Sequence, residues 1–362
     1  MFPRRLASVD IFRGCTILLM ILVNTPGTWS AVYSPFLHAP WHGYTLTDLV
    51  FPFFLFIVGV SISLSYKDKK LKWPIFIKLS KRSLKLIGIG LFLGAFTISF
   101  PFIKDFEDIR FPGVLQRIGV VFFFATMLYL WGSKRSISLI IGIILVGYWL
   151  WMGFLPIDGM APTYERAANN WANYLDLKLL GTHMWKADYD PEGVLSTLPA
   201  IATALIGTLS GDILRSNVYQ KTALLLLMGV IFLGLGYLLQ LQFPINKALW
   251  SSSFVLVTAG WANLVLGSLF YIHEVKKIRF GKIFSKVGTN AIAIYVCSSF
   301  ITKLFYLIPV NGSSIHGYLF EKWYKNQGME TELSSLLYAL SVCVFYALMA
   351  WYMDQKKIFI KV

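Results

Sequence analysis

Long apolar stretches alternate with shorter polar connections along most of the chain. A helix that crosses a membrane needs about 20 predominantly apolar residues. Stretches of roughly that length lie at about 9–26, 48–66, 83–100, 113–132, 136–155, 195–214, 221–240, 250–272, 286–308 and 332–354. The pattern predicts an all-α polytopic membrane protein, a bundle of about ten transmembrane helices.

Composition supports this class and excludes two others. The chain has 362 residues, of which 56% are hydrophobic and 14% are charged, and its mean hydropathy is +0.63. A soluble fold of this size has too little interior to hide so much apolar surface. A disordered chain, in contrast, is poor in apolar residues. We therefore interpret residues 1–362 as a single transmembrane domain.

The distribution of positive charge predicts how the bundle is oriented. The net charge is +15. Most lysines and arginines fall in every second connection, including the segments 67–85 and 276–286 and both chain ends. This is the positive-inside pattern, so both termini are predicted to be cytoplasmic in a multi-pass protein of the cell membrane. Membrane topology explains the charge, and we expect no nucleic acid as a partner.

Unusual polar residues gather on the opposite, extracytoplasmic side. One connection there, at about 156–194, is long enough that we expect it to be functional or to contain short helices. Polar groups are costly in a membrane bundle, which makes them functional candidates. The candidates on this side are Asn24, His38, His42, Asp48, Gln116, Arg117, His183, Asp190, Glu192, Trp250 and Ser251.

Several of these residues also have a purely structural interpretation. A histidine in a connection, such as His38 or His42, is often simply hydrated. Arg117 lies one turn inside the bundle and needs an anion, which Asp48, Asp190 or a substrate could supply; Glu192 is a further possible partner. Aromatic residues of the long connection form either a belt at the membrane interface or a surface on which a sugar stacks. These aromatic residues are Trp171, Tyr174, Trp185 and Tyr189.

Three further features are expected to be structural. Asp10 and Arg13, three positions apart on one helix, are expected to form an ion pair. Asn290 is expected to cap the helix that follows it. The cysteines, at positions 15, 297 and 343, lie far apart in apolar stretches. Their spacing indicates neither a disulfide framework nor a metal site, so we predict no metal.

Four segments near the N-terminus carry a specific pattern: SVDIFRG at 8–14, MILVN at 20–24, HAPWHG at 38–43 and TDLVFPFFLFIVG at 47–59. Shorter matches follow in order: GVLQRIG at 113–119, DPEG at 190–193, LW at 249–250 and GTNAI at 288–292. Over nearly the whole chain, this pattern resembles the heparan-α-glucosaminide N-acetyltransferase family, in a compact microbial form.

The resemblance implies a membrane-bound acyltransferase. Such enzymes take acetyl groups from cytoplasmic acetyl-CoA and place them on an amino sugar across the membrane. The histidine proposed as catalytic in the family falls on His38, the asparagine near the end of the first span on Asn24, and the arginine of the Gln-Arg pair on Arg117. Where the family usually has Trp-Asn-Gly, this chain has His42 in the middle position, which changes the expected contacts with the acceptor.

The chemistry of acetyl transfer suits the polar residues of this side. A thioester is already activated, so the reaction needs a base for the sugar amine, and histidine is the natural choice. Asp48 would hold the imidazole of His38, and the amide of Asn24 would donate to the developing oxyanion. The candidates for binding the acceptor are Gln116, Arg117, His42, His183, Asp190, Glu192, Trp250 and Ser251.

Acetyl-CoA is the expected donor substrate, and its phosphates cannot cross hydrocarbon. Its nucleotide is therefore expected near the inner face, where Asn290, Lys282 and Lys286 are the candidate cofactor-binding residues. Positive-inside topology alone also explains these lysines. We favour direct transfer over an acetylated His38.

Two other functions remain open. An O-acyltransferase that modifies hydroxyls of a cell-envelope glycan would use much the same residues. A multi-pass transporter is the alternative from a different class, although its polar sites are expected near the membrane midplane and not at one face. A homodimer is also open.

Overall fold

The computed structural model describes residues 6–66, 69–216, 220–325 and 328–360. Within these ranges the chain is almost entirely helical, with one short hairpin of β1 (Pro309–Val310) and β2 (Ser313–Ser314). This confirms the predicted all-α class. Four residues of the predicted charge pattern, Arg4, Arg5, Lys67 and Lys361, lie outside the described residues.

Eight helices in the described ranges are long and apolar enough to cross a membrane. They are α1 (Ala7–Asn24), α2 (Leu46–Tyr66), α4 (Val114–Trp131), α5 (Lys134–Phe154), α7 (Thr197–Arg215), α8 (Lys221–Leu239), α9 (Ser252–Phe270, continued by the π-helical turn η3, Tyr271–Val275) and α13 (Thr331–Gln355). Each coincides, apart from a few residues at its ends, with a stretch predicted from the sequence. The predicted multi-pass architecture is therefore confirmed.

The other two predicted stretches differ from straight spans. The stretch 286–308 is divided between α10 (Lys282–Thr289) and α11 (Ala291–Leu307), which meet at a bend of 82° and together form a ninth candidate span. The stretch 83–100 belongs to α3 (Trp73–Ala95), which begins earlier than predicted and carries four positive residues between Lys78 and Lys85. Its early turns are too charged for a membrane span, so the tenth span stays a prediction.

Helix α2 is the centre of the bundle. It packs against α1, α4, α7 and α9, and 78% of its candidate span is buried, against 17% for α8. The rings of Phe12 and Phe53 join α1 to α2 with centroids 5.4 Å apart, and the rings of Phe51 and Trp250 lie 5.2 Å apart. Helix α8 lies at the periphery and exposes apolar side chains such as Leu227, as a lipid-facing helix does.

Glycine allows α2 and α7 to touch along their backbones. A Cβ atom on Gly59 would lie 1.9 Å from the carbonyl oxygen of Ala204, and one on Gly207 would lie 2.1 Å from that of Phe56. No side chain fits in either place. Such close backbone approach is typical of small residues at helix interfaces in membranes, and it fixes α2 relative to α7.

The predicted ion pair on α1 is present and is structural. Nη1 of Arg13 lies 3.1 Å from Oδ1 of Asp10 and 3.2 Å from the carbonyl oxygen of Gly288, to which it also donates. Nη2 of Arg13 donates to Oγ of Ser61 at 2.7 Å. One guanidinium therefore ties α1 to both α10 and α2.

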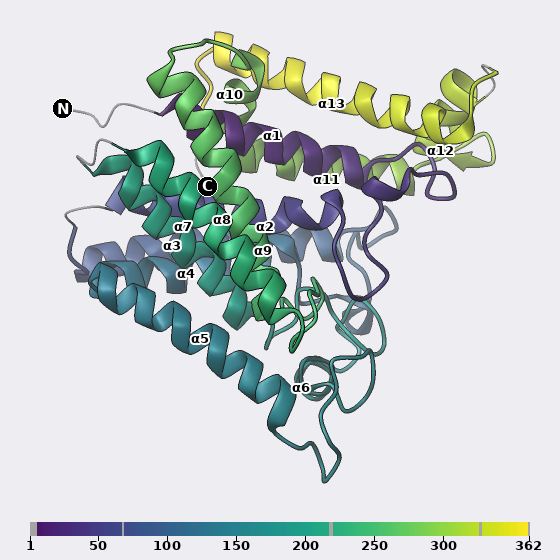
Figure 1. Cartoon of the computed structure of the whole chain (residues 1–362). Coiled ribbons are helices and arrows are strands. Elements are labelled where there is room, and N and C mark those ends of the chain that lie inside the picture. The colour runs from purple at the N-terminus through teal and green to yellow at the C-terminus, as the bar shows by residue number, and fades with distance from the viewer. Residues whose placement is uncertain (1–5, 67–68, 217–219, 326–327, 361–362) are drawn as a thin grey trace.

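The connections with the candidate residues gather at one end of the bundle (Figure 1). They include the segment after α1, with η1 (Ser34–Phe36), the segment after α3, with η2 (Phe106–Asp108), and the long connection 156–194. This last connection contains α6 (Trp171–Leu180), the kind of short helix that its length indicated. Helix α12 (Ile315–Phe320) and the turn η4 (Glu321–Lys325) lie between α11 and α13.

The first turn of α1 and the last turn of α13 lie at the other end of the bundle (Figure 1). The described chain therefore enters and leaves the bundle at the same end, as two termini on one side of a membrane require. The cytoplasmic location of that end stays a prediction from the charge pattern.

Candidate active site

A histidine and an aspartate meet where the connection after α1 joins the first turn of α2. Nδ1 of His38 lies 2.6 Å from Oδ1 of Asp48. Oδ2 of Asp48 accepts hydrogen bonds from the backbone N–H groups of Ala39 and Thr45, both at 3.0 Å. The Asp48 side chain is 1% exposed and that of His38 is 55% exposed. A carboxylate can only accept, so Nδ1–H of His38 donates to it and the lone pair of the neutral ring lies on Nε2.

The imidazole of His38 lines a cavity of about 290 Å³. Walls of this cavity come from the end of α1, the first turns of α2 and several of the gathered connections. Its other polar and aromatic lining residues include Asn24, Arg110, Trp185, Tyr189, Glu192 and Lys247. The volume is near the lower limit for small-molecule sites, so the cavity can hold the reacting part of a substrate.

Asn24 is the last residue of α1, is exposed, and lines the same cavity. The cavity follows α1 as far as Met20, one turn earlier on the helix. Three predicted catalytic residues, Asn24, His38 and Asp48, are therefore brought to one cavity from two helices and the segment between them. Their catalytic roles stay predictions.

Lys247 is a charged neighbour of this pair that sequence reasoning missed. Its Nζ atom lies 3.0 Å from Nδ1 of His38 and 3.4 Å from Oδ1 of Asp48. The side chain is 18% exposed and belongs to the connection between α8 and α9. Burial lowers the pKa of Lys247, and the charges of Asp48 and Glu192 act in the opposite direction.

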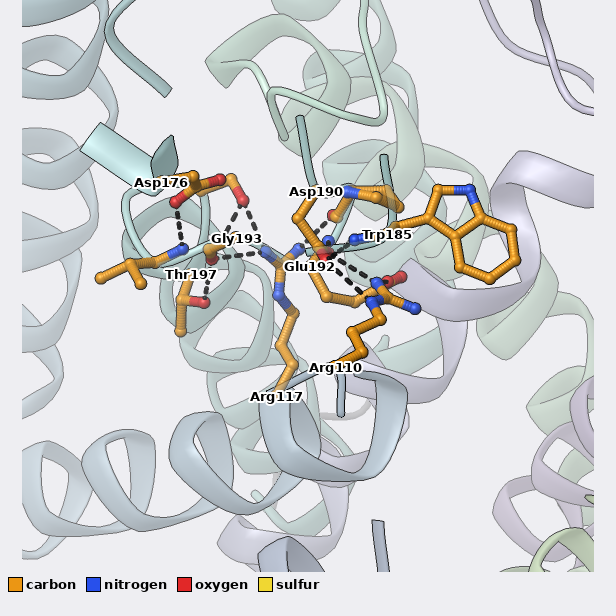
Figure 2. A network of polar contacts seen from close by, with 11 residues as sticks. Arg110, Arg117, Asp176, Trp185, Asp190, Glu192, Gly193 and Thr197 are labelled. Atoms are coloured by element: carbon orange, nitrogen blue, oxygen red, sulfur yellow. Dashed lines mark hydrogen bonds and ion pairs between the residues drawn. The ribbon is translucent and has the colours of Figure 1, made fainter. Parts of the chain in front are cut away.

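Arg110, also missed from the sequence, lines the same cavity and holds part of its wall in place. Its guanidinium donates to both carboxylate oxygens of Asp190, at 2.7 and 2.5 Å, and to Oε2 of Glu192 at 2.5 Å (Figure 2). Asp190 also accepts the backbone N–H groups of Trp185 and Glu192, both at 2.8 Å. Burial disfavours the charged guanidinium, but the bond to Asp190 and the two carboxylate charges prevail and raise the pKa of Arg110.

Arg117 is buried beside this network and holds a backbone turn (Figure 2). Its guanidinium donates to the carbonyl oxygens of Pro191 and Gly193, at 3.1 and 2.9 Å, and to Oγ of Ser196 at 2.5 Å. The sequence left its partner open between a carboxylate and a substrate; the direct partners in the structure are carbonyl and hydroxyl oxygens. Its proposed contact with substrate stays a prediction.

Asp176 on α6 supports the same turn from the other side (Figure 2). Oδ1 of Asp176 accepts the backbone N–H of Val194 at 2.8 Å. A Cβ atom on Gly193 would lie 1.7 Å from Oδ2 of Asp176, so any other residue there would have to displace this carboxylate. Burial raises the pKa of Asp176 to about 6.

The two other predicted histidines lie beside the cavity and brace its connections. Nε2 of His42 lies 3.1 Å from Oε1 of Glu165. Nδ1 of His183 donates to the carbonyl oxygen of Ile109 at 2.8 Å, and its ring stacks on Phe111 with centroids 3.9 Å apart. Both residues fasten the long connection 156–194 to other connections at this end.

The remaining predicted acceptor-binding residues lie within the helical packing. The Gln116 side chain fills the space over Gly90 where α4 meets α3. Trp250 is buried and donates from Nε1 to Oγ1 of Thr203 at 3.0 Å. Ser251 caps α9 through the backbone N–H of residue 254. The structure therefore places all three outside the cavity lining, and their contact with substrate stays a prediction.

The predicted cofactor-binding residues lie at the other end of the bundle. The Asn290 side chain donates to the carbonyl oxygen of Ile358 and accepts from the N–H of Ile360, both at 3.0 Å. Asn290 stands at the N-cap position of α11, as expected, but its side chain makes no capping hydrogen bond; the amide fastens the C-terminal segment instead. Lys286 pairs with Asp354 at 3.2 Å, and Lys282 is exposed at the start of α10.

Fold and site together define a polytopic membrane protein with a histidine–carboxylate pair in a polar cavity at one end of its bundle. The chain belongs to the heparan-alpha-glucosaminide N-acetyltransferase family, because the model described as "Heparan-alpha-glucosaminide N-acetyltransferase, catalytic" matches residues 5–239. This match confirms the family resemblance of the motifs. It includes His38, Asp48 and Arg110 and ends before Lys247.

Two curated relatives align with almost the whole chain. They are the heparan-alpha-glucosaminide N-acetyltransferases of Homo sapiens and Mus musculus, each 30% identical over an alignment 419 residues long. The alignments cover 99% of this chain and 60% of each relative. The chain thus spans about three fifths of the length of the curated relatives that it matches.

Proposed function

We propose that this chain is a membrane-bound acetyltransferase that moves an acetyl group from acetyl-CoA to the amine of an amino sugar, with His38 as general base. The observation that carries the proposal is the hydrogen bond between His38 and the buried carboxylate of Asp48 at the wall of the cavity. Membership of a family whose curated members are named as glucosaminide N-acetyltransferases supports the choice of reaction.

His38 acts first as general base and then as general acid in this mechanism. The amine nitrogen attacks the thioester carbonyl carbon, and the tetrahedral centre collapses as the carbon–sulfur bond breaks. Nε2 of His38 takes the proton from the nitrogen and returns it to the departing thiolate. Asp48 holds the imidazole with Nε2 as its basic atom and stabilises the imidazolium while it lasts. No acetylated histidine is needed.

Asn24 is assigned to the developing oxyanion. Its amide lines the cavity at the end of α1, and a side-chain N–H directed at an oxyanion contributes about 3 kcal/mol to transition-state stabilisation. Because Asn24 lies at the end of a buried helix, its backbone is held in place when substrate binds.

The acceptor, an amino sugar, is assigned to the part of the cavity wall that Arg110 holds in place. Glu192 lines the cavity and offers a carboxylate to the amine or hydroxyls of a sugar, while Trp185 and Tyr189 offer aromatic faces. Asp190 is not among the cavity-lining residues and acts through Arg110 by fixing its guanidinium. Among the predicted binding residues, Arg117, His42 and His183 hold the connections of this end in place.

The donor, acetyl-CoA, is assigned to the other end of the bundle, and its acyl arm is assigned a path along α1 from that end to the cavity. From Asp10, which contacts α10, to Asn24, the helix rises about 20 Å. In this arrangement Lys282, Lys286 and Asn290 receive the nucleotide on the cytoplasmic side, and the acyl arm follows α1 to the cavity. The reaction would then cross the cell membrane, with one copy of residues 1–362 or a homodimer as the working unit.

A comparison of acceptors tests the proposal. Purified protein is incubated with isotope-labelled acetyl-CoA and either glucosamine or N-acetylglucosamine, and the products are identified by mass spectrometry. We expect label on glucosamine, with free CoA formed in equal amount, because glucosamine has a free amine. Equal labelling of both sugars would favour hydroxyl acylation, and an intact thioester with every acceptor would favour a transporter.

A further inference from the structure

Lys247 approaches the His38–Asp48 pair from a different part of the chain. Its Nζ atom lies 3.0 Å from Nδ1 of His38, 3.4 Å from Nε2 of His38 and 3.4 Å from Oδ1 of Asp48. It lines the cavity together with them. A charged amine so close to a candidate base must affect how readily that base holds a proton.

Hydrogen bonding around Nδ1 decides what Lys247 does there. The Nδ1–H of His38 is donated to Asp48 at 2.6 Å, so Nδ1 has no lone pair with which to accept from the ammonium. The partner of the ammonium is therefore the Asp48 carboxylate. Its positive charge offsets the negative charge of Asp48 beside the ring.

We propose that Lys247 is a positioning residue that balances the charge of Asp48 and keeps the imidazole of His38 in its neutral, proton-accepting form. The proposal rests on the proposed function, since it deepens the account of the same base. A buried carboxylate alone would favour the imidazolium, which cannot accept a proton. With Lys247 in place, Asp48 still orients the ring. The charge of Lys247 offsets much of the stabilisation that Asp48 would give to the imidazolium.

The other charged groups around this site leave the argument intact. Glu192, from the long connection, is bonded to Arg110, and Arg110 also pairs with Asp190. Arg117 of α4 adds a more distant positive charge that acts on Lys247. Within the described part of the chain, Lys247 and Asp48 are the charged groups in direct contact with the imidazole.

The test replaces Lys247 with Met and follows two pH profiles. The first is kcat/KM for amine acetylation. The second is the rate at which diethyl pyrocarbonate, which reacts with neutral imidazole, modifies His38, measured on the corresponding peptide by mass spectrometry. The modification profile needs no transferase activity, so it tests the effect of Lys247 on His38 even if the proposed function fails.

We expect both profiles of Lys247→Met to move to higher pH by about one unit or more, because loss of the ammonium favours the imidazolium. Lys247→Arg keeps the charge and should stay near the wild-type profile. The control Lys322→Met removes an exposed lysine from η4 and should shift neither profile. Size-exclusion profiles and thermal midpoints identify any variant that has unfolded.

An unshifted modification profile in Lys247→Met would overturn the proposal. So would an equal loss of kcat/KM at every pH, since that result assigns Lys247 to substrate or oxyanion binding. If the wild-type protein transfers no acetyl group while the modification profile shifts as expected, the proposed function fails and the effect of Lys247 on His38 stands.

Discussion

The Asp48 carboxylate receives Nδ1–H of His38 on one oxygen and two backbone N–H groups on the other. An asparagine has a single oxygen, so it cannot serve both sets of donors. Asp48→Asn is expected to lower kcat by about two to four orders of magnitude, because the imidazole loses its tautomer and orientation. Steady-state kinetics of acetyl transfer measure this.

The matched control is Asp188→Asn, which changes an exposed carboxylate on the same end of the molecule. It should leave kcat close to the wild-type value. An Asp48→Asn protein that is folded and fully active would remove Asp48 from the mechanism.

Arg110→Gln is expected to destabilise the fold as well as the site. It leaves the buried carboxylate of Asp190 and the partly buried one of Glu192 without their cation, and breaking a buried ion pair typically costs about 3 kcal/mol or more. The comparison is Arg166→Gln, whose partner Asp188 is half exposed, so the expected loss is below about 1 kcal/mol. Denaturant unfolding in detergent compares the two. Equal losses would contradict the structural role given to Arg110.

Stability should depend on pH through Asp176. Its pKa is raised to about 6 in the folded protein, above the ordinary value of 3.8. Between these values the folded state binds more protons than the unfolded state, so the free energy of unfolding falls as pH rises through this interval.

The substitution Asp176→Asn keeps an oxygen for the N–H of Val194 and has no charge to bury. We expect a higher thermal midpoint than wild type at pH of about 7, with the difference vanishing at pH of about 4. Thermal scans at both pH values measure it. Wild-type and variant curves that stay parallel would rule out this role for Asp176.

The contact between α2 and α7 predicts that Gly207 is intolerant of even one methyl group. Gly207→Ala places a Cβ atom 2.1 Å from the carbonyl oxygen of Phe56, and forcing the helices apart is expected to cost about 1–3 kcal/mol. In the matched control Gly142→Ala on α5, the new Cβ atom meets nothing within 4 Å. The control should be neutral or slightly stabilising, and similar losses for both would contradict the contact.

The sequence was sufficient for the fold class because length and apolar character mark a membrane span locally. It was less informative for α3 and for the bend between Thr289 and Ala291. At α3, charged residues continue the helix beyond its apolar half. At the bend, the apolar stretch continues while the chain turns. The Asn290 side chain at this point binds the distant segment 358–360, a contact that local sequence does not reveal.

The candidate site was partly predictable for the same reason. His38 and Asp48 lie ten positions apart, close enough for a local motif to contain both. Lys247 is 209 positions from His38, and Arg110 is 80 positions from Asp190. Contacts over such separations depend on the packing of the whole bundle. Both residues are positive and lie in connections that the charge pattern predicts to be extracytoplasmic, where positive residues are fewer, and this was the signal that could have singled them out.

The most direct test of the central claim compares the wild-type protein with His38→Ala in the presence of isotope-labelled acetyl-CoA and glucosamine. Mass spectrometry follows the mass of one labelled acetyl group on the sugar, and size-exclusion chromatography checks that both proteins are folded. We predict labelled N-acetylglucosamine from the wild type and none above background from folded His38→Ala. Equal labelling by the two proteins would contradict the account.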